Sequence, residues 1–483
     1  MSALINITLR FAAIALTSAC LLSAVHAQST ITVITTADGP TEGFNDPTPV
    51  TPVGGNPGTT LGAQRLFLFE SAAAVWAELL NSPVEIIVNA QFSPQSCSPM
   101  GSVLGSAGGT TVHADFTNAP VAGVWYSAAL ASSLAGSDLN GGTPEINTTF
   151  NSAIDTGCSG SVGWYYGVDG NPPPDRINLF PVVLHELGHG LGFQTFTSVT
   201  TGQFISGTPD IWTQFMFDTE FDDFWINLSQ PQRQASAIND PDLVWDGPSV
   251  NGAVPEALDP SQQLTVSTPP ALAGNYPAMM ASYGPPVPID GLPGDFVFVD
   301  DGTAPDATDG CEALTPASAG DVNGNIAVIR RGTCNFTAKT LNAQAAGATA
   351  VLIANNVPDG LPPMGGDAPG ITIPSIGISQ QLGNDIQAQL PSPGVSGVLD
   401  YDFVNLAGTT NGFLRLHAPN PVAPGSSVSH WTTAATPSLL MEPAITPDLF
   451  DDVDLSLNLF EDIGWSVNFP TEEIFSDSFE TIL

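Results

Sequence analysis

The chain has 483 residues, and its 47 acidic side chains against 8 lysines and arginines give a formal net charge of −39 at pH 7. This length exceeds that of one ordinary domain and predicts two or three domains. The negative charge argues against nucleic acid or an anionic membrane as a partner, because their phosphates would be repelled.

Residues 1–27 have the features of a secretory signal peptide. Arg10 supplies a positive charge, an apolar run extends from Phe11 to about Ala24, and Ala27 is a small residue suited to cleavage. The apolar run is short for a membrane span, and no other segment of the sequence approaches the required length. We therefore predict a secreted protein without a stable membrane anchor.

The expected mature chain retains four cysteines, Cys97, Cys158, Cys311 and Cys334. An even number of cysteines in an exported protein indicates disulfide bonds. Three pairings are possible, and we favour Cys97–Cys158 with Cys311–Cys334 because each pair then falls inside one expected domain. No two of the four are spaced closely enough to suggest a zinc–thiolate cluster.

The first half of the mature chain predicts an α+β domain. Residues 28–60 are rich in Gly, Pro, Thr and Asp and are expected to be irregular. Apolar positions recur at helical spacing over residues 66–80, and Ser82-Pro83 ends this helix. Strands are expected over residues 84–90 and 147–154.

A second helix, predicted from about Pro181 to Leu191, carries the pattern His185-Glu186-Leu187-Gly188-His189. Two histidines four residues apart lie on one face of a helix, so both imidazoles can reach a single metal ion. The glutamate between them can accept a proton from a metal-bound water. This arrangement is typical of a zinc peptidase.

The second half begins with a block that alternates strands and helices. Residues 194–262 show no clear pattern and continue the first domain. A strand–helix–strand unit and one more strand follow, over residues 325–330, 336–346, 350–354 and 371–378. This unit predicts a second domain at about 264–404. A short helix capped by Asp454 and closed by Gly464 comes next, before an acidic tail at 471–483.

A catalytic zinc usually has three protein ligands and one position for water. The metzincin pattern H-E-x-x-H-x-x-G-x-x-H would place the third histidine at position 195, where this chain has Thr195. The other histidines of the expected mature chain are His113, His417 and His430. His430 is followed by Trp431 and, eleven residues after itself, by Met441 in the run Leu440-Met441-Glu442-Pro443.

The sequence resembles the leishmanolysin-like metzincins. In that branch an insertion separates the glycine of the motif from the third histidine, which is followed by a tryptophan, as His430 is by Trp431. The resemblance implies that His430 is the third zinc ligand. It also implies that Met441 is the Met-turn residue, a soft apolar floor beneath the imidazoles that is not itself a ligand. A glutamate ligand, as in thermolysin-like enzymes, is the alternative, with Glu220 as its candidate; it would leave Gly192 and His430 unexplained.

The insertion resembles a PA (protease-associated) domain. The residues that carry this resemblance are Cys311, Ile326 to Phe336, Lys339, Ala345 to Ala348, Asn355-Asn356 and Ile373-Pro374. Because the entropy of loop closure grows only logarithmically with length, a folded domain can be inserted if its ends lie close together. The expected organisation is a catalytic domain at 28–263 and 405–470, interrupted by a PA domain at 264–404.

These observations predict a mixed α+β, metzincin-like fold and a secreted zinc metalloendopeptidase acting on proteins or peptides. Glu186 would be the general base. The substrate would add as an extra strand to a sheet edge at about residues 147–154. The alternative is a non-catalytic exported binding protein that uses the PA domain and keeps a structural or relict zinc site.

Calcium is a further expected ligand, because clustered carboxylates of the acidic chain could bind it. Residues 321–325 have the sequence Asp-Val-Asn-Gly-Asn, which superficially resembles a calcium loop. This segment lacks a glutamate at the twelfth position and runs directly into a strand, so we predict a tight turn there.

Overall fold

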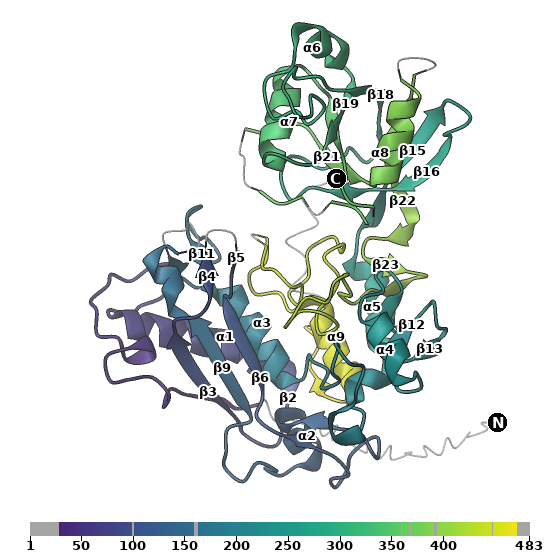
Figure 1. Cartoon of the computed structure of the whole chain (residues 1–483). Helices are drawn as coiled ribbons and strands as arrows, with labels where there is room; N and C mark the ends of the chain where they lie inside the picture. The colour runs from purple at the N-terminus through teal and green to yellow at the C-terminus, as the bar shows by residue number, and fades with distance from the viewer. Residues whose placement is uncertain are drawn as a thin grey trace, which may run out of the picture.

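The computed structural model describes residues 29–470 except 99–100, 159–162, 359, 363, 367–369, 391–393 and 447. The signal peptide expected at 1–27 and the acidic tail expected at 471–483 lie outside these residues. Figure 1 shows two lobes, one built from both ends of the described chain and one from its middle.

The sheet of the first lobe has the strand order β1-β3-β9-β6. Its strands are β1 (Ile31–Ile34), β3 (Ile86–Ser93), β9 (Ile146–Asn151) and β6 (Gly105–Gly109). The first three run parallel, and β6 is antiparallel to β9. The expectation that residues 28–60 are irregular is wrong at β1, because a four-residue strand is too short to give a recognisable periodicity.

Two helices pack with this sheet. Helix α1 (Leu61–Leu79) is capped by Thr60, whose hydroxyl accepts the N–H of Ala63. Helix α3 (Leu179–Leu191) is buried along its whole length, contacts α1, β9 and β6, and ends at Gly192 with φ 128°. The helix predicted at 181–191 is therefore present and begins two residues earlier, after Asn178, which caps it.

The position of β9 corrects one expectation. Its residue Ile146 pairs with Val88 of β3 on one side and with Gly109 of β6 on the other. Residues 147–154 therefore do not form a sheet edge that could receive a substrate. Among the described strands β6 pairs only with β9, so β6 is the edge strand on this side of the sheet, and β1 is the other edge. Its sequence, Gly-Ser-Ala-Gly-Gly, lacks the β-branched and aromatic residues by which a strand is recognised.

The middle lobe is an eight-stranded sheet with the order β16-β15-β22-β18-β19-β20-β21-β17. Strands β18 to β21 run parallel, and the predicted strand–helix–strand unit is present as β19, α7 and β20. The elements are β15 (Pro260–Thr268), β16 (Gly274–Pro277), β17 (Met279–Met280), β18 (Leu292–Phe298), α6 (Pro316–Val322), β19 (Ile326–Arg330), α7 (Phe336–Ala345), β20 (Ala350–Ala354), β21 (Ser375–Ile378), α8 (Gln380–Ala388) and β22 (Ser396–Leu406).

The chain enters and leaves this lobe at one place. Pro260 at the start of β15 pairs with Leu406 at the end of β22. The N–H of Ala407 donates to the carbonyl of Asp259 at 2.8 Å. The two ends are therefore adjacent, as an inserted domain requires; the boundaries 264–404 stay a prediction.

After the middle lobe the chain returns to the first lobe. Helix α9 (Asp454–Ile463) packs its Phe460 against Trp76 of α1, with ring centroids 5.0 Å apart. Strand β25 (Ser466–Val467) pairs with β2 (Leu80–Asn81). The other elements here are α2 (Ala128–Ala135), α4 (Gln230–Ser236), α5 (Pro248–Ala257), and the short strands β4 (Cys97–Ser98), β5 (Gly101–Ser102), β7 (Val112–His113), β8 (Tyr126–Ser127), β10 (Trp164–Tyr165), β11 (Ile177–Asn178), β12 (Met216–Asp218), β13 (Asp223–Phe224), β14 (Leu243–Trp245), β23 (Thr409–Thr410) and β24 (Phe413–Leu414).

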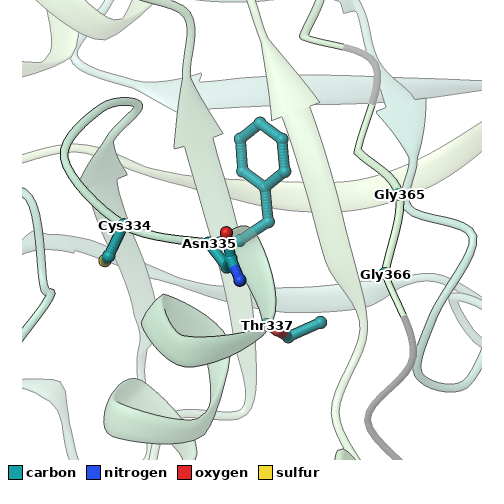
Figure 2. Close-up of a pocket in the computed structure, with 6 residues that line it drawn as sticks. Cys334, Asn335, Thr337, Gly365 and Gly366 are labelled. Carbon is teal, nitrogen blue, oxygen red and sulfur yellow. The ribbon is translucent and has the colours of Figure 1, made fainter. Parts of the chain in front are cut away.

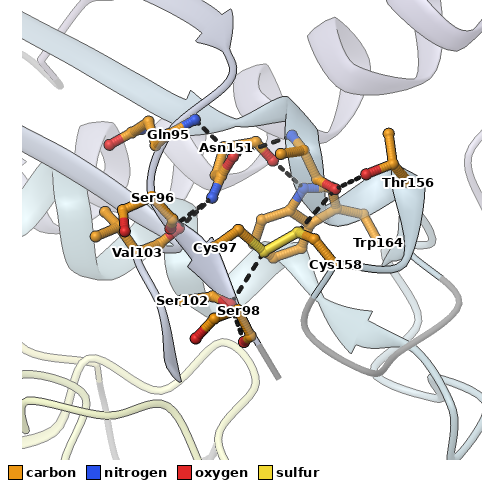
Figure 3. Close-up of a disulfide and its surroundings, with 11 residues drawn as sticks. Gln95, Ser96, Cys97, Ser98, Ser102, Val103, Asn151, Thr156, Cys158 and Trp164 are labelled. Carbon is orange, nitrogen blue, oxygen red and sulfur yellow. Dashed lines mark hydrogen bonds between the residues drawn. A yellow bond between two sulfur atoms is a disulfide. The ribbon is translucent and has the colours of Figure 1, made fainter. Parts of the chain in front are cut away.

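Both favoured disulfides, Cys97–Cys158 and Cys311–Cys334, are confirmed. The Cys97–Cys158 disulfide holds the segment that leads into β6, and hydrogen bonds from Asn151 hold the same segment (Figure 3). The Asn151 amide donates to the carbonyl of Val103 at 2.7 Å, and its oxygen accepts the N–H of Gln95 at 2.9 Å. Within the described residues, no helix combines the length and the apolar character needed to cross a bilayer.

Candidate metal centre

Three histidines from distant parts of the chain meet at one point. His185 and His189 lie on α3, and His430 lies in the loop segment before α9. Their Nε2 atoms form a triangle with sides of 3.1 Å (185–189), 3.2 Å (189–430) and 3.2 Å (430–185). All three residues are buried, with exposures of 7%, 9% and 4%.

The other ring nitrogen of each histidine is held by a backbone carbonyl. Nδ1 of His185 donates to Leu440 at 2.7 Å, Nδ1 of His189 to Phe193 at 2.7 Å, and Nδ1 of His430 to Ser426 at 2.8 Å. A proton on Nδ1 leaves Nε2 with a free lone pair, so three lone pairs converge.

Burial also keeps these imidazoles neutral. It lowers the pKa of His185 to about 4 and that of His189 to about 3, and it lowers the pKa of His430 well below its ordinary value. Neutral imidazoles are the form that binds metal ions. Nitrogens separated by 3.1–3.2 Å can each lie about 2.0–2.1 Å from one zinc ion placed beside their plane, with one position left open. The three residues therefore fit a zinc ion.

Glu186 lies between His185 and His189 on α3 and is buried. A Cβ atom built on Gly105 of β6 would lie 2.9 Å from both Cγ and Oε1 of Glu186, so the strand lies directly against this side chain. Burial raises the pKa of Glu186 to about 8. A divalent cation beside the carboxyl group would favour its ionised form, which is the form that accepts a proton.

Met441 packs against the helix that carries His185 and His189. Its side chain is fully buried, and its Sδ is 2.8 Å from the point that a Cβ on Gly188 would occupy. The carbonyl of Met441 accepts the N–H of Trp431 at 2.9 Å. Met441 therefore packs against α3 at Gly188, and its backbone holds the segment that carries His430.

The residues considered as alternatives lie elsewhere or have other partners. Thr195 donates its hydroxyl to Asp210 at 2.8 Å, and Glu220 is exposed and accepts a hydrogen bond from Asn239. His113 contacts Thr111 and Asn140, and burial lowers the pKa of His417 to about 4. None of these side chains joins the group formed by His185, His189 and His430.

Asp210 was not singled out from the sequence. Its buried carboxylate accepts hydrogen bonds from Thr195, from the N–H of Phe196 and from the N–H of Thr213. It thereby fixes the loop that leaves α3 after the second histidine. The sequence carries no local sign of this role, because the bonds form only once residues 195 and 210 are brought together.

Asp301, Asp309 and Glu312 of the middle lobe form a second group whose carboxylate oxygens lie within 4.8 Å of one another. The ammonium group of Lys339, which is fully buried, contacts the carbonyl of Asp309 and lies 3.3 Å from Sγ of Cys311. Because these carboxylates already have a buried cation near them, calcium gains no support here. A cavity of about 450 Å³ lies nearby, lined by Cys334 to Thr337, Gly365 and Gly366 (Figure 2).

Comparison with known proteins identifies one part of the chain. Residues 294–386 match the PA domain family. The PA domain predicted from the sequence is therefore confirmed for these residues, and the chain is a mixed α/β protein that contains it.

Two curated proteins are similar to about a quarter of the chain. Signal peptide peptidase-like 4 of Oryza sativa subsp. japonica is 36% identical over 131 residues, which are 26% of this chain and 23% of that protein. Vacuolar-sorting receptor 7 of Arabidopsis thaliana is 32% identical over 136 residues, 26% of this chain and 21% of that protein. The chain thus spans less than a quarter of the length of either relative.

Among solved structures, a zinc aminopeptidase from Bacillus subtilis is 21% identical, with a TM-score of 0.23 over 32% of this chain and 36% of that chain. An aminopeptidase from Aneurinibacillus sp. strain AM-1 is 23% identical, with a TM-score of 0.22 over 30% of each chain. Similarity at this level does not assign a fold or an activity to the whole chain.

Proposed function

We propose that this protein is an exported zinc metalloendopeptidase whose metzincin-like catalytic domain is interrupted by a PA domain. The observation that carries the proposal is the triangle of three neutral imidazoles, with Nε2 atoms 3.1–3.2 Å apart, together with the buried Glu186 on the helix of two of them. Two observations support the metzincin-like assignment: the third histidine comes from a distant segment, and Met441 packs against α3 at Gly188.

His185, His189 and His430 would hold the zinc ion. When bound, zinc supplies an activated water and a Lewis acid for the scissile carbonyl. Glu186 accepts the proton of the attacking water and later delivers it to the leaving amine. The backbone carbonyls that hold each Nδ1 keep the rings oriented throughout.

The substrate would bind along β6. An extended peptide can pair with a free strand edge, and β6 is the edge of the sheet nearest Glu186. Because β6 is made of glycine, serine and alanine, a substrate backbone meets little steric obstruction there. This strand takes the place of residues 147–154 in the sequence-based expectation.

Export is supported by two disulfides, by the expected signal peptide at 1–27 and by the PA domain. The alternative function, an exported binding protein with a structural or relict zinc site, is favoured by one observation. The PA domain contains a cavity of about 450 Å³, lined by Cys334 to Thr337, Gly365 and Gly366, which could receive a partner.

Cleavage of unfolded casein distinguishes the two functions. The mature wild-type protein should cleave casein internally, and a zinc chelator or Glu186→Ala should abolish the cleavage. A wild-type protein that holds zinc but leaves casein and short N-terminally blocked peptides intact would favour the binding protein. Peptides blocked at the N-terminus also separate an endopeptidase from an aminopeptidase.

A further inference from the structure

The turn formed by residues 439–442 joins two segments that carry the proposed metal ligands. The carbonyl of Leu440 accepts Nδ1–H of His185 at 2.7 Å. The carbonyl of Met441 accepts the N–H of Trp431, the neighbour of His430, at 2.9 Å. The position of this turn therefore sets the orientation of one ligand directly and the position of another through its neighbour.

Two carboxyl groups hold the N–H groups of the same turn. Oε1 of Glu442 accepts the N–H of Leu439 at 2.9 Å, and Oδ2 of Asp454 accepts the N–H of Leu440. The other oxygen of Asp454 accepts the N–H of Ser456 at 3.1 Å and its hydroxyl at 3.0 Å. Asp454 thus fastens the turn to the first residues of α9, and Glu442 closes the turn on itself.

We propose that Glu442 and Asp454 are positioning residues for the metal centre, which act through the turn and touch neither the metal nor the substrate. The proposal rests on the zinc site of the proposed function. Without these carboxyl groups two backbone N–H groups would lose their partners in a buried turn, and such groups are costly to leave unsatisfied. The turn would relax, and the carbonyl that orients His185 would move with it.

The test is the zinc affinity of the full mature chain, measured by competition with a chromogenic chelator. Asp454→Ala and Glu442→Ala should each weaken zinc binding roughly 10–100-fold, the usual effect of removing groups that orient metal ligands. Asp454→Asn and Glu442→Gln keep an oxygen acceptor of the same shape and should stay within about threefold of the wild type. Cobalt(II) in place of zinc should show an altered visible spectrum only in the alanine variants.

Asp462→Ala is the matched control. Asp462 lies on the same helix and accepts hydrogen bonds from the N–H of Ser249 at 2.8 Å and from Nε1 of Trp245 at 3.0 Å, away from the turn. Its removal should lower the unfolding temperature and leave zinc affinity unchanged. If an alanine variant does not fold, Glu442→Asp serves in its place, because its shorter side chain withdraws the carboxyl group from Leu439; it should show the same loss.

The outcomes separate the two proposals. A wild-type protein that takes up no zinc would refute the proposed function. A wild-type protein that binds zinc, with turn variants that bind it equally well and give the same cobalt spectrum, would overturn the role of Glu442 and Asp454 alone. A loss of affinity in Asp462→Ala equal to that in Asp454→Ala would show that general destabilisation explains the effect, and would also overturn it.

Discussion

Gly105 lies directly over Glu186, so close that a Cβ atom at position 105 would come within 2.9 Å of the glutamate Cγ. Real Cβ atoms do not approach other atoms this closely, so any larger residue at 105 must displace the glutamate or the strand. The edge strand β6 and the proposed general base Glu186 are therefore sterically complementary.

Gly105→Ala should lower kcat for peptide cleavage by at least tenfold while one zinc ion stays bound, because the base is displaced and the ligands are not. Gly252→Ala on α5 is the control in the same lobe. A Cβ there would meet no other atom within 4 Å, and activity should stay near that of the wild type. Equal activities for the two variants would contradict the fit between Gly105 and Glu186.

Residues 260–406 should be removable. Their ends are adjacent, with the N–H of Ala407 2.8 Å from the carbonyl oxygen of Asp259. A chain in which two glycines join Asp259 to Ala407 should fold and bind zinc with near wild-type affinity. Circular dichroism and zinc titration check this; a product that is insoluble with several linker lengths would show that the first lobe depends on the insertion.

Stability should depend on pH through Glu442 and Asp454. Burial raises the pKa of Glu442 from 4.5 to about 8 and that of Asp454 from 3.8 to about 7. A group whose pKa is raised in the folded state contributes stability below its unfolded pKa, and this contribution is lost as the pH rises through its folded pKa. The free energy of unfolding of the metal-free protein should therefore fall as the pH rises from about 5 to about 8.

The double variant Glu442→Gln, Asp454→Asn should remove this part of the pH dependence, because amides do not titrate. Urea unfolding of the metal-free proteins at pH 5, 6.5 and 8 measures it as the difference between variant and wild type. Repulsion among surface carboxylates contributes equally to the stability of both proteins, so it drops out of this difference. A difference that does not change with pH would show that neither group has a raised pKa.

The sequence predicted the local parts of the site well. The spacing of His185, Glu186 and His189 is a property of one helix, and this helix follows from residues close together in the chain; its cap, Asn178, was not predicted. His430 lies 241 residues beyond His189, and no periodicity links them, so only the resemblance to a known family pointed to it. The structure brings all three histidines together.

Other parts could not be predicted because their signal is tertiary. Strand β6 is three-fifths glycine and is a strand only because it pairs with β9. Because β6 was not predicted, the substrate was expected to pair with residues 147–154, most of which belong to the interior strand β9. Asp210 is an ordinary acidic residue in an acidic sequence, and Asp454 was expected only as a helix cap, although α9 begins at Asp454 and has Val453 at the cap position. The roles of both residues appear only when the N–H groups from which they accept hydrogen bonds lie beside them.

The most direct test of the central claim is the zinc content of folded protein after dialysis, measured by plasma emission spectrometry for the wild type, His430→Ala and His417→Ala. His417 is the matched control, because it is a largely buried histidine whose backbone N–H bonds the carbonyl of His430 and whose side chain lies outside the group. We predict one zinc ion per chain in the wild type and in His417→Ala, and almost none in His430→Ala. Folded His430→Ala protein that keeps a full zinc ion would contradict the three-histidine site.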